Sequence, residues 1–173
     1  MKDMKKILLV GMVAGLLMTS CTKDEIGGTV LQQMAGEWFC ELQFQDDGEW
    51  VNLLSLYGAD YFFMLTYNTA ANNNELFIDD EEELWPFKGK VKCDIDNLTF
   101  STGGTQTENL YDKDASFEVK NGKILLGGAR SVAGHVTDGI YMEIEFADDP
   151  GEIYRIIGHR RTGFDADYHF DLW

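Results

Sequence analysis

The residues best suited to chemistry are a cationic run near the C-terminus, His159-Arg160-Arg161, and one carboxylate before it, Asp138. An arginine holds a carboxylate or phosphate through paired hydrogen bonds, and a histidine exchanges protons near neutral pH. An inward arginine would therefore suit the polar head of a fatty-acid-like ligand. A pair of His159 with Asp138 would suit acid–base catalysis. The sequence does not show whether that pair meets. The alternative for both arginines is pairing with carboxylates of this very acidic chain.

The phase of the surrounding strands decides which of these side chains share a face. His159 and Arg161 have one strand phase and Arg160 has the other, so only one of the two arginines can point inward. Asp138 is in phase with the apolar residues that follow it, which would bury its carboxylate unless Gly139 marks a bulge. A buried Asp needs a cationic partner, so we expect Asp138 to pair with Arg160 or Arg161. Such a pair more often fixes strand register than binds a ligand.

A second candidate ligand contact is Tyr67-Asn68, which ends an aromatic segment beginning at Tyr61 and opens an Asn-rich stretch that runs to Asn74. Asn adopts turn conformations readily, so a tight hydrogen-bonded turn is one interpretation. A loop at the mouth of a cavity, whose amides meet a polar ligand, is the other. Further aromatic residues could line a pocket or pack in the core. They are Trp50, Tyr57, Tyr61 and Trp85.

Five consecutive carboxylates run from Asp79 to Glu83. Calcium accepts such oxygens, but the run lacks the alternation and the glycine of a calcium-binding loop. We therefore expect a solvated acidic turn, and the sequence predicts no metal site and no cofactor.

Catalytic motifs are missing from the sequence, which contains neither a Gly-x-Ser-x-Gly elbow nor a His-Glu-x-x-His helix. Cys40 and Cys93 fall on the apolar phase of predicted strands, where a buried cysteine packs as a small hydrophobe. A disulfide between them stays open as the alternative. We predict no catalytic residue, and a hydrolase acting on an ester or glycan remains the alternative function.

The N-terminus has the pattern of a secretory signal. Three lysines within the first six residues precede an apolar run from Ile7 to Met18, about 12 residues long and too short to cross a bilayer as a helix. Small residues then lead into Cys21, an arrangement that resembles the lipobox of bacterial lipoproteins. We expect residues 1–20 to be a signal peptide, Cys21 to carry the lipid anchor, and residues 21–30 to be a lipidated polar tether.

Charge limits the partners. The formal net charge is −16, and removal of residues 1–20, with three Lys and one Asp, would leave −18. This argues against nucleic acid as a partner and against adsorption to an anionic bilayer through basic residues, so membrane attachment is expected through the lipid alone. Thr22-Lys23-Asp24-Glu25 resembles the short signals that send lipoproteins of Bacteroidetes to the cell surface. The alternative for these four residues is a plain solvated tether. We expect a lipid-anchored outer-membrane protein on the periplasmic or the cell-surface face, with Lys23-Asp24-Glu25 favouring the surface.

Alternation of apolar and polar residues with period 2 dominates the mature chain and predicts antiparallel strands. It is clearest over residues 38–44, 87–95 and 140–146. Asn121-Gly122 predicts a tight hairpin turn, and residues 96–97 and 148–151 predict two more turns. Residues 26–34 are the one candidate for a short helix.

A sheet this long must hide its apolar face by closing on itself. We therefore expect an all-β fold, an antiparallel up-and-down, lipocalin-like barrel of about eight to ten strands with at most one short N-terminal helix. Residues 31–173 would form this single domain. A barrel of about eight strands has room inside for its own side chains or for one small ligand.

Five motifs in register resemble a family of Bacteroidetes lipoproteins described as lipid-binding putative hydrolases. They are Tyr67-Asn68-Thr69-Ala70-Ala71-Asn72, Asn121-Gly122-Lys123-Ile124-Leu125, Val136-Thr137-Asp138-Gly139-Ile140-Tyr141, Phe146-Ala147-Asp148-Asp149-Pro150-Gly151 and Gly158-His159-Arg160-Arg161-Thr162-Gly163-Phe164. The resemblance implies a lipocalin-like or calycin-like barrel, and it carries over no catalytic set.

Together these observations predict an envelope-anchored lipoprotein whose barrel takes up a small apolar or amphipathic, lipid-like ligand. The alternatives are the hydrolase and a structural or adhesive surface protein whose barrel is filled by its own side chains. Interior volume discriminates among these functions.

Overall fold

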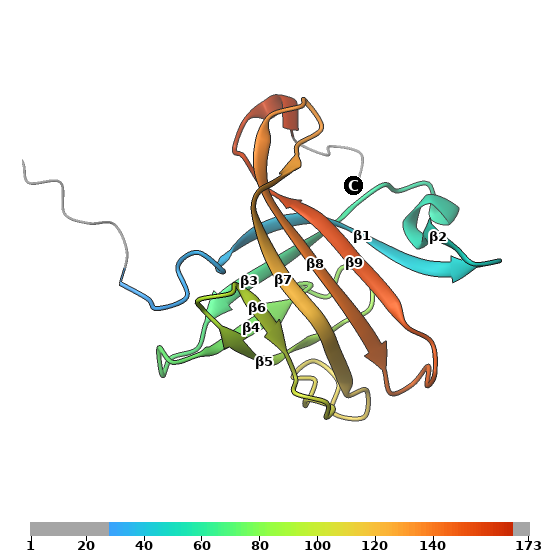
Figure 1. Cartoon of the computed structure of the whole chain (residues 1–173). Coiled ribbons are helices and arrows are strands. Elements are labelled where there is room, and N and C mark those ends of the chain that lie inside the picture. The colour runs from blue at the N-terminus through green and yellow to red at the C-terminus, as the bar shows by residue number, and fades with distance from the viewer. Residues whose placement is uncertain (1–27, 168–173) are drawn as a thin grey trace, which may run out of the picture.

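The computed structural model describes residues 28–167, which form one antiparallel sheet closed into a barrel (Figure 1). The strands are β1 (Gly36–Asp46), β2 (Glu49–Asn52), β3 (Phe62–Asn68), β4 (Glu75–Asp79), β5 (Lys88–Asp94), β6 (Thr99–Ser101), β7 (Phe117–Arg130), β8 (Val136–Phe146) and β9 (Tyr154–Arg160). Two 3-10 helices, η1 (Leu53–Tyr57) and η2 (Asp165–Asp167), complete the regular structure of this part of the chain. The signal peptide, Cys21 and most of the tether lie outside the described residues.

Strands that follow one another in the chain lie side by side, and β9 returns to pair with β1. The first residues of β1 pair with β3 and its last residues pair with β2, so β2 extends the sheet outside the ring. The ring therefore contains eight strands. The prediction of an all-β, up-and-down antiparallel barrel is confirmed.

The period-2 pattern places one face of each strand inside the barrel, and those side chains form one continuous apolar core. Its strand members are Trp38, Cys40, Leu42, Phe62, Met64, Leu76, Ile78, Val91, Phe100, Phe117, Val119, Ile124, Ile140, Met142, Ile144, Phe146, Tyr154 and Ile156. At one end the core is closed by Leu31 and Met34, which belong to the segment that leads into β1. At the other end Trp85 stacks on Phe146 with ring centres 4.5 Å apart. The interior is thus filled by the protein's own side chains.

The candidate helix over residues 26–34 is not formed in its described part. Residues 30–34 make hydrogen-bonded turns in which the amides of Met34 and Ala35 both donate to the carbonyl of Leu31, at 2.8 and 3.0 Å. The next residue, Gly36, already begins β1, so the segment is too short to propagate a helix. The turns serve to bring Leu31 and Met34 into the core.

Asn121-Gly122 is not a hairpin turn, contrary to the prediction. β7 continues through it as a bulge, with a register shift between Lys120 and Lys123 and a φ of 53° at Asn121. A Cβ on Gly122 would lie 2.4 Å from the Phe100 ring, so glycine is required here by close packing. The left-handed preference of Asn thus makes a bulge rather than a turn. The chain reverses instead at residues 131–135, where the Ser131 amide donates to the His135 carbonyl at 2.9 Å.

The acidic run is not a solvated turn either, because its first two carboxylates are buried. Asp79 is 3% and Asp80 0% exposed. Asp80 accepts backbone hydrogen bonds from four residues of the following loop, and burial raises its pKa to about 6 despite them. The donors are the amides of Glu82, Leu84, Trp85 and Phe87. Only residues 81–83 face water.

Candidate functional site

Arg160 is the arginine that points inward. Its guanidinium lies over the Trp38 ring, 4.6 Å from the ring centre. Nη1 donates to the Ala35 carbonyl at 2.7 Å and Nη2 to the Gln33 carbonyl at 3.2 Å. A Cβ on Gly36 would lie 2.7 Å from Nη1, so the glycine that begins β1 leaves room for this arginine. Arg160 therefore ties the last strand to the segment that leads into the first.

The expected partnership of Asp138 with an arginine is present. Arg160 Nε lies 3.1 Å from Asp138 Oδ2, close enough for an ion pair, although among the described residues no acceptor is aligned for a hydrogen bond from Nε. The second carboxylate oxygen accepts the Gly127 amide at 2.9 Å and holds a bulge of β7 in place. Both side chains are half-buried, and their contacts serve the end of the barrel rather than an open ligand site.

Arg161 points the other way and pairs with Glu37 on the outer wall, at 2.6 Å between Nη1 and Oε2. The structure thus separates the two neighbouring arginines as the strand phase predicted. Neither shares a site with the other.

Tyr67 and Asn68 belong to a different part of the wall. Tyr67 donates its hydroxyl hydrogen to Asp79 at 2.7 Å, as Tyr111 does, and Lys88 Nζ lies 2.7 Å from the same carboxylate. Asn68 donates to the neighbouring Thr69 carbonyl at 3.0 Å. The turn that follows β3 is closed by the Asn72 amide, which donates to the Thr69 carbonyl at 3.0 Å, as the tight-turn interpretation expects.

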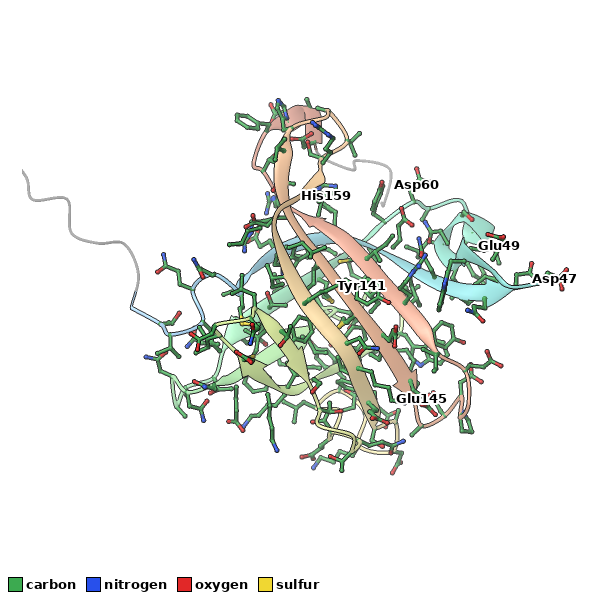
Figure 2. All side chains as sticks on the ribbon, viewed as in Figure 1. Asp47, Glu49, Asp60, Tyr141, Glu145 and His159 are labelled. Carbon is green, nitrogen blue, oxygen red and sulfur yellow. The ribbon has the colours of Figure 1, made fainter. Side chains whose placement is uncertain are left out.

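His159 points outward but is only 5% exposed, because aromatic side chains cover it. Its ring lies 5.7 Å from that of Phe39 and 5.9 Å from that of Tyr61, centre to centre. Tyr61 sits just before β3, so the aromatic segment predicted there covers the outer wall with one face and fills the core with the other. Figure 2 shows His159 and Tyr141 on the face formed by β8 and β9.

An open cavity of about 270 Å³ lies beside His159 on this outer face. Its floor contains Gly139, where an added Cβ would approach Ala129 and Leu125 at 3.3 and 3.6 Å. The second bulge of β7, between Leu125 and Ala129, forms one wall of the cavity. Ile157 and Tyr61 lie in the other wall. The side chains of Glu41, Arg130 and His159 also line the cavity. Gly139 is one of three glycines that line the cavity, with Gly128 and Gly158.

Two more open cavities continue this hollow along β8. Tyr141 lines both the first cavity and a second of about 540 Å³, and Glu143 lines both the second and a third of about 270 Å³. Lys123 Nζ lies 4.5 Å from the centre of the Tyr141 ring, and the tyrosine hydroxyl donates to Glu143 at 2.8 Å. Each cavity shares one lining residue with the next along the outer wall, and we call the three together the β8 groove; it is more apolar at the His159 end and more polar toward Glu143.

Comparison with known families gives a match over most of the chain. A family model described as lipid-binding putative hydrolase matches residues 23–165. The chain belongs to this family. A search of curated proteins finds no match.

Membership of the lipid-binding putative hydrolase family supports a ligand-binding protein. The barrel supports ligand binding as a scaffold, but its interior positions are occupied by core side chains. Three open cavities lie on the outer wall of the described barrel. The sequence pattern could not show this, because the groove depends on Gly139 and on a bulge that alternation alone does not reveal.

The hydrolase part of the family description directs attention to a Ser, His and Asp cluster that sequence reasoning missed. Asp167 lies 2.9 Å from His135 Nδ1, accepts the Thr162 hydroxyl at 2.6 Å, and is also hydrogen-bonded by Ser131. In a catalytic triad the histidine stands between the serine and the carboxylate. Here Asp167 is the shared centre and the serine hydroxyl is directed at it, so the cluster holds the C-terminal segment against the β7–β8 turn.

Metal chemistry finds no support in the described part of the chain, where no three His, Cys, Asp or Glu side chains converge on one point. Cys40 and Cys93 are both free thiols, the first buried and the second half-buried, as expected for packing residues. Within residues 28–167 no helix is long and apolar enough to span a membrane.

Proposed function

We propose that this protein is anchored at the outer membrane through a lipid on Cys21, on the cell surface rather than the periplasmic face, and binds a small apolar or amphipathic, lipid-like ligand in the β8 groove. One observation supports the groove over the barrel interior: the inward positions are filled by buried side chains, whereas the cavity of about 270 Å³ beside His159 is open. The sequence pattern alone favoured the interior.

The groove suits an amphipathic molecule. An apolar chain would lie over Gly139 between Leu125 and Ile157, where its burial is favoured by roughly 0.8 kcal/mol for each methylene. An anionic head would meet Arg130, which lines the same cavity and uses Nη1 to hold the Gly134 carbonyl at 3.0 Å. A guanidinium has five N–H donors, so this bond leaves others for a ligand.

Tyr61 adds a polar contact at the opposite wall. Burial raises the pKa of its hydroxyl, and the charges of Glu41 and Asp60 raise it further. The hydroxyl is therefore protonated at neutral pH.

The anchor rests on the sequence. The lysine-rich start, the short apolar run and the small residues before Cys21 together resemble a lipoprotein signal, and the acidic chain offers little other attraction to an anionic bilayer. Residues 23–25 support the surface face.

Native mass spectrometry tests the ligand. The chain from residue 21 with Cys21→Ala would be purified without detergent, and any retained molecule would be extracted and identified. A fluorescent fatty acid then tests uptake in the same chain and in Gly139→Val, whose side chain fills the floor of the groove. Gly28→Val serves as the matched control, since a Cβ there meets nothing within 4 Å.

We expect a retained lipid or fatty-acid uptake in the parent chain and in Gly28→Val, and a loss of about tenfold or more in affinity for folded Gly139→Val. An empty parent chain that takes up no fatty acid overturns the proposal. If Gly139→Val takes up the fatty acid as well as the parent chain does, the ligand does not bind in the groove. The anchor is tested separately by the mass of the mature N-terminus, which should carry acyl chains on Cys21 and lose them in Cys21→Ala.

A further inference from the structure

The tip of the β7–β8 hairpin exposes a cluster of large apolar side chains. They are Leu126 (54% exposed), Val132 (57%), Val136 (63%) and, from the segment after β9, Phe164 (59%). Figure 1 shows this hairpin projecting beyond the rest of the barrel with η2 against it. Phe164 is held there by the ring of His135, 5.1 Å away between centres. Contiguous exposed apolar side chains mark a surface that contacts a partner or a membrane.

The tip is also the part of the chain from which acidic residues are missing. Residues 119–137 contain no Asp or Glu, although the whole chain has 30. Arg130 is the cation nearest the turn, because Lys120 lies farther down the hairpin and is paired with Glu118 and Glu145. Near the tip, Asp138 lies 3.1 Å from Arg160 Nε and Asp167 lies 2.9 Å from His135, whereas Asp165 of η2 is exposed. An anionic lipid surface therefore repels the tip less than it repels the rest of this very acidic protein.

The tip lies at the barrel end where the N-terminal segment arrives. Arg160 connects the two, because it pairs with Asp138 at the base of the hairpin and donates to the Gln33 and Ala35 carbonyls. Thr137 donates its hydroxyl hydrogen to the Arg160 carbonyl at 3.3 Å. The ten-residue tether predicted from residue 21 to 30 spans at most about 35 Å when extended. A lipid on Cys21 would therefore hold this end of the barrel close to the bilayer.

We propose that the β7–β8 tip inserts its apolar side chains into the surface of the membrane that carries the anchor. The inference rests on the proposed function for the anchor and for the ligand. It deepens both, since the bulge of β7 next to the tip forms a wall of the β8 groove. The groove then opens beside the lipid surface, so an amphipathic molecule can move between membrane and protein without crossing water.

Vesicle flotation tests the tip without the anchor. The chain from residue 21 with Cys21→Ala is mixed with phosphatidylcholine vesicles, with and without phosphatidylglycerol. The tip variant is Leu126→Glu/Val132→Glu. Its matched control is Leu56→Glu/Tyr57→Glu, which places the same two charges at exposed apolar positions of η1, 63% and 80% exposed. Far-ultraviolet circular dichroism checks that each variant is folded.

We expect the parent chain and the η1 variant to float with the vesicles and the tip variant to lose about tenfold in bound fraction. A parent chain that does not float, or equal loss in both variants, overturns the proposal. The proposal is also overturned if the parent chain does not bind vesicles but sediments as a dimer, and the tip variant sediments as a monomer. The tip would then join two copies of the chain.

The fatty-acid assay separates this inference from the proposed function. The tip variant should keep fatty-acid uptake, and Gly139→Val should lose uptake but still float. Absence of flotation with normal uptake refutes the inserted tip alone. Absence of uptake with normal flotation refutes the ligand alone.

Discussion

Arg160 lies over the ring of Trp38, with 4.6 Å between the guanidinium carbon and the ring centre, and this contact joins the last strand of the barrel to the first. Trp38 is fully buried and its Nε1 donates to Thr66 Oγ1 at 2.8 Å, while the same hydroxyl donates to the Met34 carbonyl at 2.7 Å. One end of the barrel is thus closed by a chain of contacts that joins the first strand to the last.

Replacing Arg160 should destabilise the whole barrel. Arg160→Ala removes a cation over an aromatic ring, leaves the Ala35 and Gln33 carbonyls without their donor and leaves Asp138 without its partner. We expect a loss of about 2–4 kcal/mol in the free energy of unfolding by urea. Arg130→Ala, at an exposed arginine, should cost roughly 0.5 kcal/mol or less. Equal losses would contradict a structural role for Arg160.

Gly158→Ala should disturb the β1–β9 seam. A Cβ there would lie 2.5 Å from Cys40 Sγ and 2.5 Å from the Phe39 carbonyl oxygen. We expect about 1–3 kcal/mol of destabilisation or a failure to fold, since one of these neighbours is backbone and cannot rotate away. Cys40→Ala in the same chain should restore only part of the loss. Thermal unfolding measures the series, and full rescue by Cys40→Ala would show that the backbone contact does not matter.

Asp79 should stabilise the fold at neutral pH and lose that effect in acid. Burial alone would raise its pKa, but Lys88 and the hydroxyls of Tyr111 and Tyr67 lower it on balance below 3.8. Because the folded pKa lies below the unfolded one, the contribution is complete above the unfolded value and disappears as the pH falls through the folded one.

Urea unfolding of Asp79→Asn is the measurement. We expect this variant to be about 1–3 kcal/mol less stable than the parent at pH 7, with the difference shrinking below pH 3.8. Glu82→Gln, at an exposed carboxylate of the same loop, should cost roughly 0.5 kcal/mol or less at both pH values. A difference for Asp79→Asn that does not change with pH would refute the ionised pair.

The two thiols should react slowly in the native protein. Burial raises the pKa of Cys40 well above its usual range, and it raises that of Cys93 to about 12. In the chain with Cys21→Ala, iodoacetamide at pH 8 should label neither rapidly until denaturant is added, and then both. If no thiol is labelled even in denaturant, Cys40 and Cys93 are joined by the disulfide that the sequence left open.

Alternation was sufficient to predict the barrel, since inward and outward residues have different polarity along β1, β5 and β8. It failed where one residue type serves two purposes. Asn121 has the left-handed conformation expected of a turn, yet it makes a bulge because β7 must stay paired with β8 beyond it. Asp80 looks like any surface carboxylate until the loop folds back over it and donates four amides.

The candidate site was harder to predict than the fold. Strand phase correctly separated Arg160 from Arg161 and foresaw a partner for Asp138. It placed His159 on the face opposite to Arg160, but it could not show that this face is the outer wall of a filled barrel. The groove depends on the volume missing at Gly139, and the sequence gives no measure of that volume before the neighbouring strands are in place.

Asp167 holds the C-terminal segment against the hairpin tip. Its Oδ1 accepts the Ala133 amide at 2.8 Å, and its other oxygen meets His135 and Thr162. Burial alone would raise the pKa of Asp167, but hydrogen bonds from Ser131, Thr162 and His135 lower it well below its usual range. This group therefore stabilises the tip at every pH above 3.8 and keeps doing so until its own, lower pKa is reached.

Asp167→Asn should loosen the tip while leaving the barrel intact. The amide side chain keeps one acceptor and places an N–H₂ group against donors, so we expect hydrogen exchange at Ala133 to accelerate about tenfold or more, with exchange in β1 and β9 unchanged. In the parent chain the protection of Ala133 should persist through pH 3.8, where an ordinary Asp is half protonated. Protection that falls at the ordinary Asp pKa, or exchange that rises equally throughout the barrel in Asp167→Asn, would show that Asp167 does not act as a local latch.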